Sequence, residues 1–172
     1  TGASLKGANL ARADLFHTIF DKADLGGADL SDTYLFGANL IGTSAIGANF
    51  SGANLKDILM EGADLSRANL EGVYMLRAVI SFGKLIEARL AGAQMVGADA
   101  EGTDFSRADM RGVRLSGATL HGARLDGADL EGADLSNAVG ADYAHARNRP
   151  GSEKTNEDRS INRMLLDPAR SR

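Results

Sequence analysis

The chain has 172 residues, enough for a single domain, and Leu and Ala supply most of its apolar content. It contains no Cys, which excludes disulfides, zinc-thiolate sites and a cysteine nucleophile. The formal net charge of −4 gives no support to nucleic-acid binding, which leaves a basic footprint, and no run of apolar residues is long enough to span a membrane.

A five-residue repeat runs without a gap from Leu5 to Leu135. Leu or a close substitute stands at every fifth residue, and a small residue, most often Ala, stands two places before it. A period of five matches neither the 3.6 residues of a helical turn nor the alternation of a strand, so the pattern indicates a solenoid. A solenoid of this kind presents surfaces rather than a deep pocket, which favours recognition over catalysis.

We number the positions of each repeat one to five, beginning with residues 3–7. Position one is small, position two is often Asp or Asn, position three is Leu, position four varies and position five is often Gly. Ala28-Asp29-Leu30 shows this form well. The pattern resembles the pentapeptide-repeat family. The resemblance implies an all-β fold, a right-handed quadrilateral parallel β-helix in which four repeats make one coil, with about seven coils in this chain.

Elementary geometry agrees with this architecture. Positions one and three can both point inward across a two-residue extended step. Position five lies at a corner, where Gly is the most suitable residue, and Asp or Asn at position two can bond to nearby backbone groups. The many carboxylates are therefore interpreted as turn formers. Since His17, His121 and His145 fall at different positions without a ligand partner, we expect no catalytic residue, no metal site and no cofactor, and the protein is predicted not to be an enzyme.

Residues twenty apart should stack along the outside of such a coil. This stacking predicts a stripe of aromatic and aliphatic side chains along one corner. Exposed contiguous apolar patches usually mark a contact surface, so we expect a protein-interaction stripe. The alternative is that these side chains stabilise the coil by stacking on one another, or that another part of the chain covers them. The stripe consists of Phe16, Ile19, Tyr34, Phe36, Leu59, Tyr74, Leu76, Val79, Phe82 and Val96.

The two ends of the chain depart from the repeat. The β-helix is expected over residues 1–142, followed by a polar tail over 143–172 with a short helix at about 156–166, which either caps the solenoid or stays disordered. Thr1 and Gly2 fit the last two positions of an incomplete repeat. The sequence is therefore expected to be a fragment of a longer protein.

These observations predict a non-enzymatic protein-binding or structural scaffold domain of a larger bacterial-type protein, with a protein partner and no direct contact with nucleic acid. Some members of the resembled family protect DNA gyrase by mimicking DNA, which leaves a gyrase-binding protein as an alternative, although Lys84 and Arg111 interrupt the acidic columns. A repeat domain of a secreted effector is a third interpretation. The absence of Cys fits a reducing compartment, so a cytoplasmic location is expected.

Overall fold

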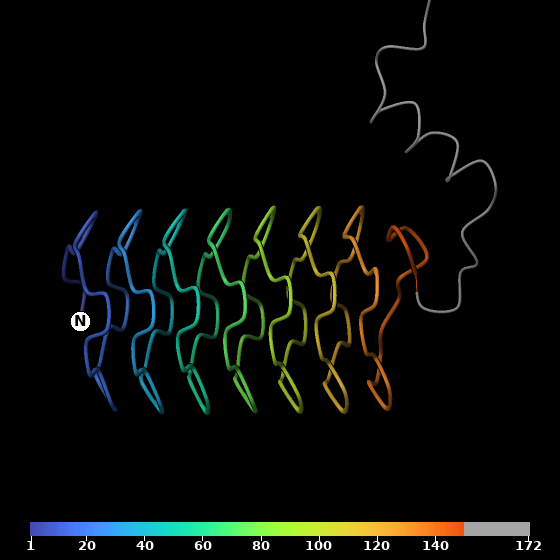
Figure 1. Cartoon of the computed structure of the whole chain (residues 1–172), viewed down its shortest axis with the longest axis horizontal. Helices are drawn as coiled ribbons and strands as arrows, with labels where there is room; N and C mark the ends of the chain where they lie inside the picture. Colours follow the sequence, from blue (N-terminus) through green and yellow to red (C-terminus); the bar gives the residue numbers. More distant parts are fainter. Residues whose placement is uncertain (150–172) are drawn as a thin grey trace, which may run out of the picture.

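The computed structural model describes residues 1–149, which form a straight rod of stacked coils (Figure 1). The described part of the chain contains no helix, and therefore none that could cross a membrane. The helix expected at about 156–166 lies outside the described residues.

Neighbouring coils are joined by parallel β-bridges between position-two residues. Every bridge except the last joins a residue to the one twenty places later, so the expected vertical adjacency of such residues is confirmed. The contacts are isolated bridges rather than continuous strands, because the backbone turns again at positions four and five of every repeat. One column consists of Ser4, Asp24, Ser44, Asp64, Lys84, Asp104 and Arg124.

The rod has four faces, because four repeats separate one bridge partner from the next. We name each face by its first repeat. Face 1 begins with residues 3–7, face 2 with 8–12, face 3 with 13–17 and face 4 with 18–22, and each face recurs every twenty residues.

Four backbone hydrogen bonds recur along the rod. The Asp24 N–H donates to the Ala3 carbonyl of the preceding coil at 2.9 Å. The Leu25 N–H donates to the Ser44 carbonyl of the next coil at 2.7 Å, and the Gly27 N–H donates to the Ile46 carbonyl at 2.9 Å. The Ala28 N–H donates to the Leu25 carbonyl at 2.9 Å and closes a β-turn around the corner. This turn needs a positive φ at its third residue, and position five has a positive φ throughout the repeats.

Some corners carry a side chain instead of Gly. Such a side chain extends toward the next coil: a Cβ built on Gly37 would lie 2.6 Å from the ring of His17. The residue twenty places later is accordingly Gly or a residue of opposite charge. Gly leaves room for the preceding side chain, and a residue of opposite charge attracts it. The pairs are Arg12 with Asp32, His17 with Gly37, Lys22 with Gly42, Asp32 with Gly52, Asp57 with Arg77, Arg67 with Glu87, Arg77 with Gly97, Phe82 with Gly102, Glu87 with Arg107, and Arg107 with Gly127.

Positions one and three fill the interior, as expected. Leu at position three and Ala at position one are buried through most of the rod. Phe50 and Phe105 also occupy position three and are fully buried, and each follows a repeat with Ala at that position, Ala45 and Ala100 respectively. The small side chain compensates for the volume of the ring, which keeps a core of fixed cross-section closely packed.

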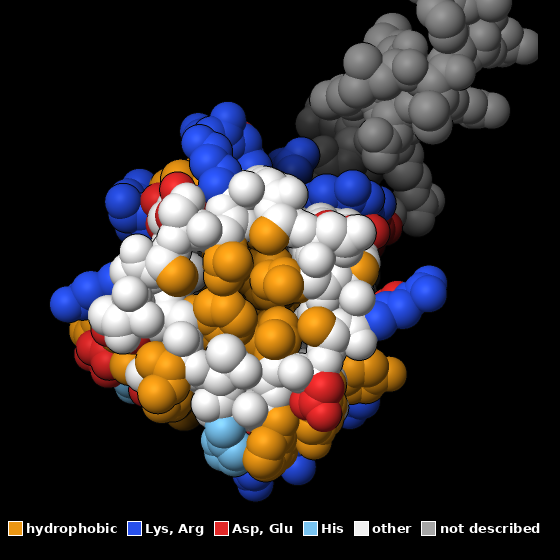
Figure 2. All heavy atoms as spheres, turned by 90° about the vertical axis from the view of Figure 1, so that its left-hand side faces the viewer, with side chains coloured by type: hydrophobic (Ala, Val, Ile, Leu, Met, Phe, Trp, Pro, Cys, Tyr) orange, Lys and Arg blue, Asp and Glu red, His pale blue; other side chains and the backbone are white. Residues whose placement is uncertain are grey.

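The two ends of the rod differ. Viewed from the N-terminal end, apolar side chains occupy the centre and backbone frames them (Figure 2). At the other end the last bridge joins Asp129 to Arg147, eighteen residues later rather than twenty. The Arg147 N–H donates to the Ala128 carbonyl at 2.7 Å, and the Leu130 N–H donates to the Arg147 carbonyl at 3.0 Å. The ladder therefore reaches Arg147, inside the segment that the sequence assigns to the tail.

Candidate interaction surface

Residues 1–149 hold no group of three or more His, Asp or Glu side chains arranged to bind a metal ion. The Nδ1 atom of His17 lies 3.2 Å from the Gly37 carbonyl oxygen, a contact that fixes the ring at its corner. A hollow of about 140 Å³ lies beside the shortened last coil. Its basic residue, Arg124, forms ion pairs with Asp104 at 3.4 Å and with Asp126 at 3.5 Å. The hollow is lined by Ala123, Arg124, Leu125, Asp126, Asp142 and His145.

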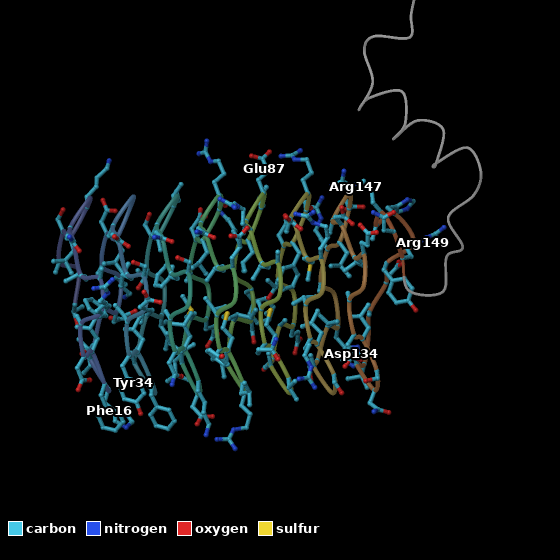
Figure 3. The ribbon with its side chains drawn as sticks, in the orientation of Figure 1. Phe16, Tyr34, Glu87, Asp134, Arg147 and Arg149 are labelled. Carbon is cyan, nitrogen blue, oxygen red and sulfur yellow. The ribbon has the colours of Figure 1, made fainter. Side chains whose placement is uncertain are left out.

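An aromatic cluster lies on face 3 near the N-terminal end of the rod. The rings of Phe16 and Phe36, one coil apart at position four, stack with their centroids 5.6 Å apart. Tyr34 stacks 6.0 Å from Phe16, and His17 meets the Phe16 ring edge-on at 4.0 Å. Figure 3 shows Phe16 and Tyr34 projecting from one edge of the rod, whereas Glu87 projects from the opposite edge. Stacked rings of this kind form a rigid surface with little side-chain freedom to lose.

The same column continues toward the middle of the rod. Lys56 follows Phe36 and places its Nζ atom 5.6 Å from the centroid of that ring, a cation–π contact. Leu76 and Val96 come next and are half-buried. Tyr74, at position two beside them, is 54% exposed. Face 3 therefore carries aromatic and aliphatic side chains over five coils, with one lysine among them.

An ion pair divides the predicted stripe. Arg77 at position five donates to both carboxylate oxygens of Asp57, each at 2.7 Å, and these hydrogen bonds lower the pKa of Asp57. Position five is the corner between faces 3 and 4. In the third and fourth coils the pair therefore separates Leu76 of face 3 from Leu59 and Val79 of face 4, whereas Ile19 lies on face 4 in the first coil.

The ten stripe residues are thus distributed over two faces and a second corner. None belongs to the buried core. Phe82 lies at position five of face 4, so it stands at the corner between faces 4 and 1, across face 4 from the aromatic cluster. Those that are exposed are Phe16, Ile19, Tyr34, Leu59, Tyr74 and Phe82. Those that are half-buried are Phe36, Leu76, Val79 and Val96.

Charged side chains on the other faces form ion pairs, some between neighbouring coils and some within one repeat. On face 1, Lys84 lies 3.8 Å from Asp64, and at the adjoining corner Arg107 lies 2.9 Å from Glu87. On face 2, Arg111 donates to both oxygens of Asp109, and these hydrogen bonds lower the pKa of Asp109. These exposed pairs orient side chains but add little stability individually.

Face 4 carries a feature that the sequence analysis did not single out. Its position four holds Asp21, Glu61 and Glu101 in alternate coils. The signal was present in the sequence, because these residues are forty apart and the coil contains twenty. It was obscured by Ile41 and Ser81, which occupy the coils between them.

Comparison with known proteins shows which family has this architecture. A family model described as pentapeptide repeats matches eight copies, over residues 1–32, 33–72, 75–112, 84–122 and 114–139. No curated protein matches the chain closely enough to count as a relative.

Among solved structures, the chain is 34% identical to HetL from the cyanobacterium Nostoc sp. strain PCC 7120, a pentapeptide repeat protein involved in heterocyst differentiation regulation. This match covers 80% of this chain and 68% of HetL, with a TM-score of 0.39. The chain is 31% identical to Rfr23 from the cyanobacterium Cyanothece 51142, over 56% of this chain and 63% of Rfr23, with a TM-score of 0.46.

The chain is also 26% identical to trypsin-treated QnrB1, a plasmid-mediated fluoroquinolone resistance protein. This match covers 85% of this chain and 77% of that one, with a TM-score of 0.50. The repeat signature, the stacking of residues twenty apart and the match to the family model agree, and the chain belongs to the pentapeptide-repeat family.

Proposed function

We propose that the chain is a non-enzymatic protein-binding or structural scaffold domain of a larger bacterial-type protein. It would act as a right-handed quadrilateral β-helix of about seven coils, in the reducing environment that a Cys-free sequence suits. The observation that carries this proposal is the outward apolar surface of face 3. A rod whose interior is already filled by Leu and Ala gains nothing for its own core from Tyr74 and Leu76 on the outside.

Stacking within the rod explains only part of this surface. Phe16, Tyr34 and Phe36 stabilise one another through ring contacts. Tyr74 makes no ring contact with another aromatic residue of the described chain and is still 54% exposed. Burying such a side chain against a partner removes apolar surface from water, which favours association.

The test is a pull-down with the double variant Tyr74→Ala, Leu76→Asp. Both side chains point outward, so the rod should keep its fold and thermal midpoint while the recovery of its partners falls. The matched control is Ser44→Ala, Ile46→Asp, which changes the same two positions on face 1. Unchanged recovery by a correctly folded face 3 variant would rule out this face as the interface.

A second candidate is a gyrase-binding protein. The likeness to QnrB1, a fluoroquinolone resistance protein, favours it. The distribution of charge argues against it, because Lys84, Arg111 and Arg124 stand among the acidic columns and pair with them. A gyrase supercoiling assay with added fluoroquinolone tests this candidate: inhibition or drug protection at low micromolar protein would favour it, and no effect would discard it.

A further inference from the structure

Face 4 combines two columns of different chemistry. Position two supplies a column in which Ile19 is 63% exposed, Leu59 is 40% exposed and Val79 is half-buried; Asn39 lies between the first two, and Asp99 follows Val79. Position four supplies the acidic column of Asp21, Glu61 and Glu101. Because positions two and four both point outward from the same face, the two columns run side by side along the rod.

The carboxylates at positions two and four of face 4 have no cationic partner among the described residues. Asp21, Glu61, Asp99 and Glu101 form no ion pair with any side chain of residues 1–149, whereas each of the other three faces has at least one carboxylate that pairs with Arg or Lys. The face contains a single Lys or Arg, Lys22, which extends instead over Gly42 of the next coil. Face 4 therefore has an excess of negative charge that the fold itself does not neutralise.

Phe82 forms a raised border to this face. Its side chain is 59% exposed, and its ring lies over Gly102 of the next coil, where a Cβ would approach within 2.6 Å. The ring is thus supported from one side and open on the other. Together with Leu59 and Val79 it offers an apolar contact beside unpaired carboxylates, which is the complement of a basic amphipathic surface.

The spacing of the carboxylates selects the shape of the partner. Coils lie about 4.8 Å apart, so carboxylates in alternate coils recur about every 9.6 Å along the rod. In an α-helix, residues seven apart lie on one side and are separated by about 10.5 Å. In an extended strand, three residues span about 10 Å, but residues three apart point to opposite sides. The spacing therefore matches a helix and not a strand.

We propose that face 4 binds a cationic amphipathic helix lying along the rod, with Lys or Arg at every seventh residue opposite Asp21, Glu61 and Glu101. Apolar side chains on the same side of that helix would cover Leu59, Val79 and Phe82. This inference rests on the proposed function and extends it, because it adds face 4 as a second binding face and gives the chemistry of the partner that this face would hold.

The direct test uses the full chain and a synthetic helical peptide of about 22 residues, with Lys at every seventh position and Leu beside it. Fluorescence anisotropy should show micromolar binding that weakens as salt is added. The triple variant Asp21→Asn, Glu61→Gln, Glu101→Gln should weaken binding about tenfold, since three exposed ion pairs contribute roughly 0.5 kcal/mol each.

Two controls separate local from general effects. The triple variant Asp14→Asn, Asp24→Asn, Asp32→Asn removes the same charge from the other three faces, where these carboxylates also form no ion pair, and it should change binding by less than about twofold. A peptide of identical composition with Lys at every fifth position should bind more weakly. Equal weakening by both triple variants, equal binding of both peptides, or no binding to the wild-type chain would overturn the proposal.

A failure of the cationic-helix proposal can be distinguished from a failure of the scaffold function. The variant Tyr74→Ala, Leu76→Asp alters face 3 only and should leave peptide binding unchanged. If that variant loses the natural partners while the face 4 triple variant keeps both partners and peptide, the scaffold function stands and the cationic-helix proposal fails. If neither variant loses the partners, the proposed function fails as well.

Discussion

The ring of Phe82 lies over Gly102, the residue twenty places later, so closely that a Cβ on Gly102 would come within 2.6 Å of the ring. The same relationship joins Asp32 to Gly52, where a Cβ would lie 2.5 Å from the carboxylate. A corner side chain thus uses the space above the next glycine. The choice of residue at position five in one coil depends on the residue in the coil before it.

This dependence gives a first prediction. Gly102→Ala and Gly112→Ala both place Ala at a positive φ, which costs about 1 kcal/mol of stability, but the Cβ at Gly112 meets open space. Gly102→Ala should therefore cost about 1 kcal/mol more than Gly112→Ala in urea unfolding. Adding Phe82→Ala should remove that difference. Equal costs for the two single variants would show that the ring moves aside freely.

A second prediction concerns Gly83, the one glycine at position one. Replacing it by Ala would match the family pattern. A Cβ there would nevertheless lie 2.8 Å from the Ile80 carbonyl oxygen and 3.3 Å from that of Ala63, and backbone atoms cannot move aside as a side chain can. Gly83→Ala should lower stability by about 1–3 kcal/mol, the usual cost of overpacking. A raised thermal midpoint would contradict this account.

A third prediction separates the inside of the rod from the outside. Leu65 is fully buried, and Leu65→Asp would place a carboxylate in the core without a partner, which should unfold the neighbouring coils. Ser66→Asp adds the same group one residue later, at an outward position, and should leave the thermal midpoint within about 2 °C of the wild type. Circular dichroism melting compares the two. Similar melting curves would mean that the inward and outward positions are assigned wrongly.

A fourth prediction concerns acid. Hydrogen bonds from Arg111 lower the pKa of Asp109, and those from Arg77 lower the pKa of Asp57. A carboxyl with a lowered folded-state pKa stabilises the fold above its unfolded pKa of about 3.9, and this contribution is lost as the pH falls through the folded value. Urea midpoints should be constant from about pH 7 to pH 5 and fall below about pH 4.

The control for this prediction is the double variant Asp57→Asn, Asp109→Asn. Neither Asn can ionise, so the fall in the urea midpoint below about pH 4 should be shallower than in the wild type. Stability that increased on acidification would contradict the assignment of these ion pairs.

The repeat period made most of the fold predictable. A constant spacing of five along the chain, with Leu at position three and Ala two residues earlier, is enough to assign Leu30 and Leu65 to the core. The grouping of Phe82 with Phe16 was less successful. Position five belongs to a corner, and the corner after face 4 lies across that face from the one after face 3. Arg77 and Asp57 also divide the stripe. Their ion pair forms because both side chains extend along the rod toward each other, and the repeat period does not encode that direction.

The shortened bridge from Asp129 to Arg147 shows how the rod accommodates a change in chain length. Two residues fewer than usual separate these partners, yet Arg147 makes the same two backbone hydrogen bonds to the preceding coil that a position-two residue makes elsewhere. Val139 still pairs with Thr119 at the regular interval, so the difference is absorbed between Val139 and Arg147. A short deletion between two bridges therefore leaves the alignment of amides and carbonyls intact, and the stacking does not require every coil to contain the same number of residues.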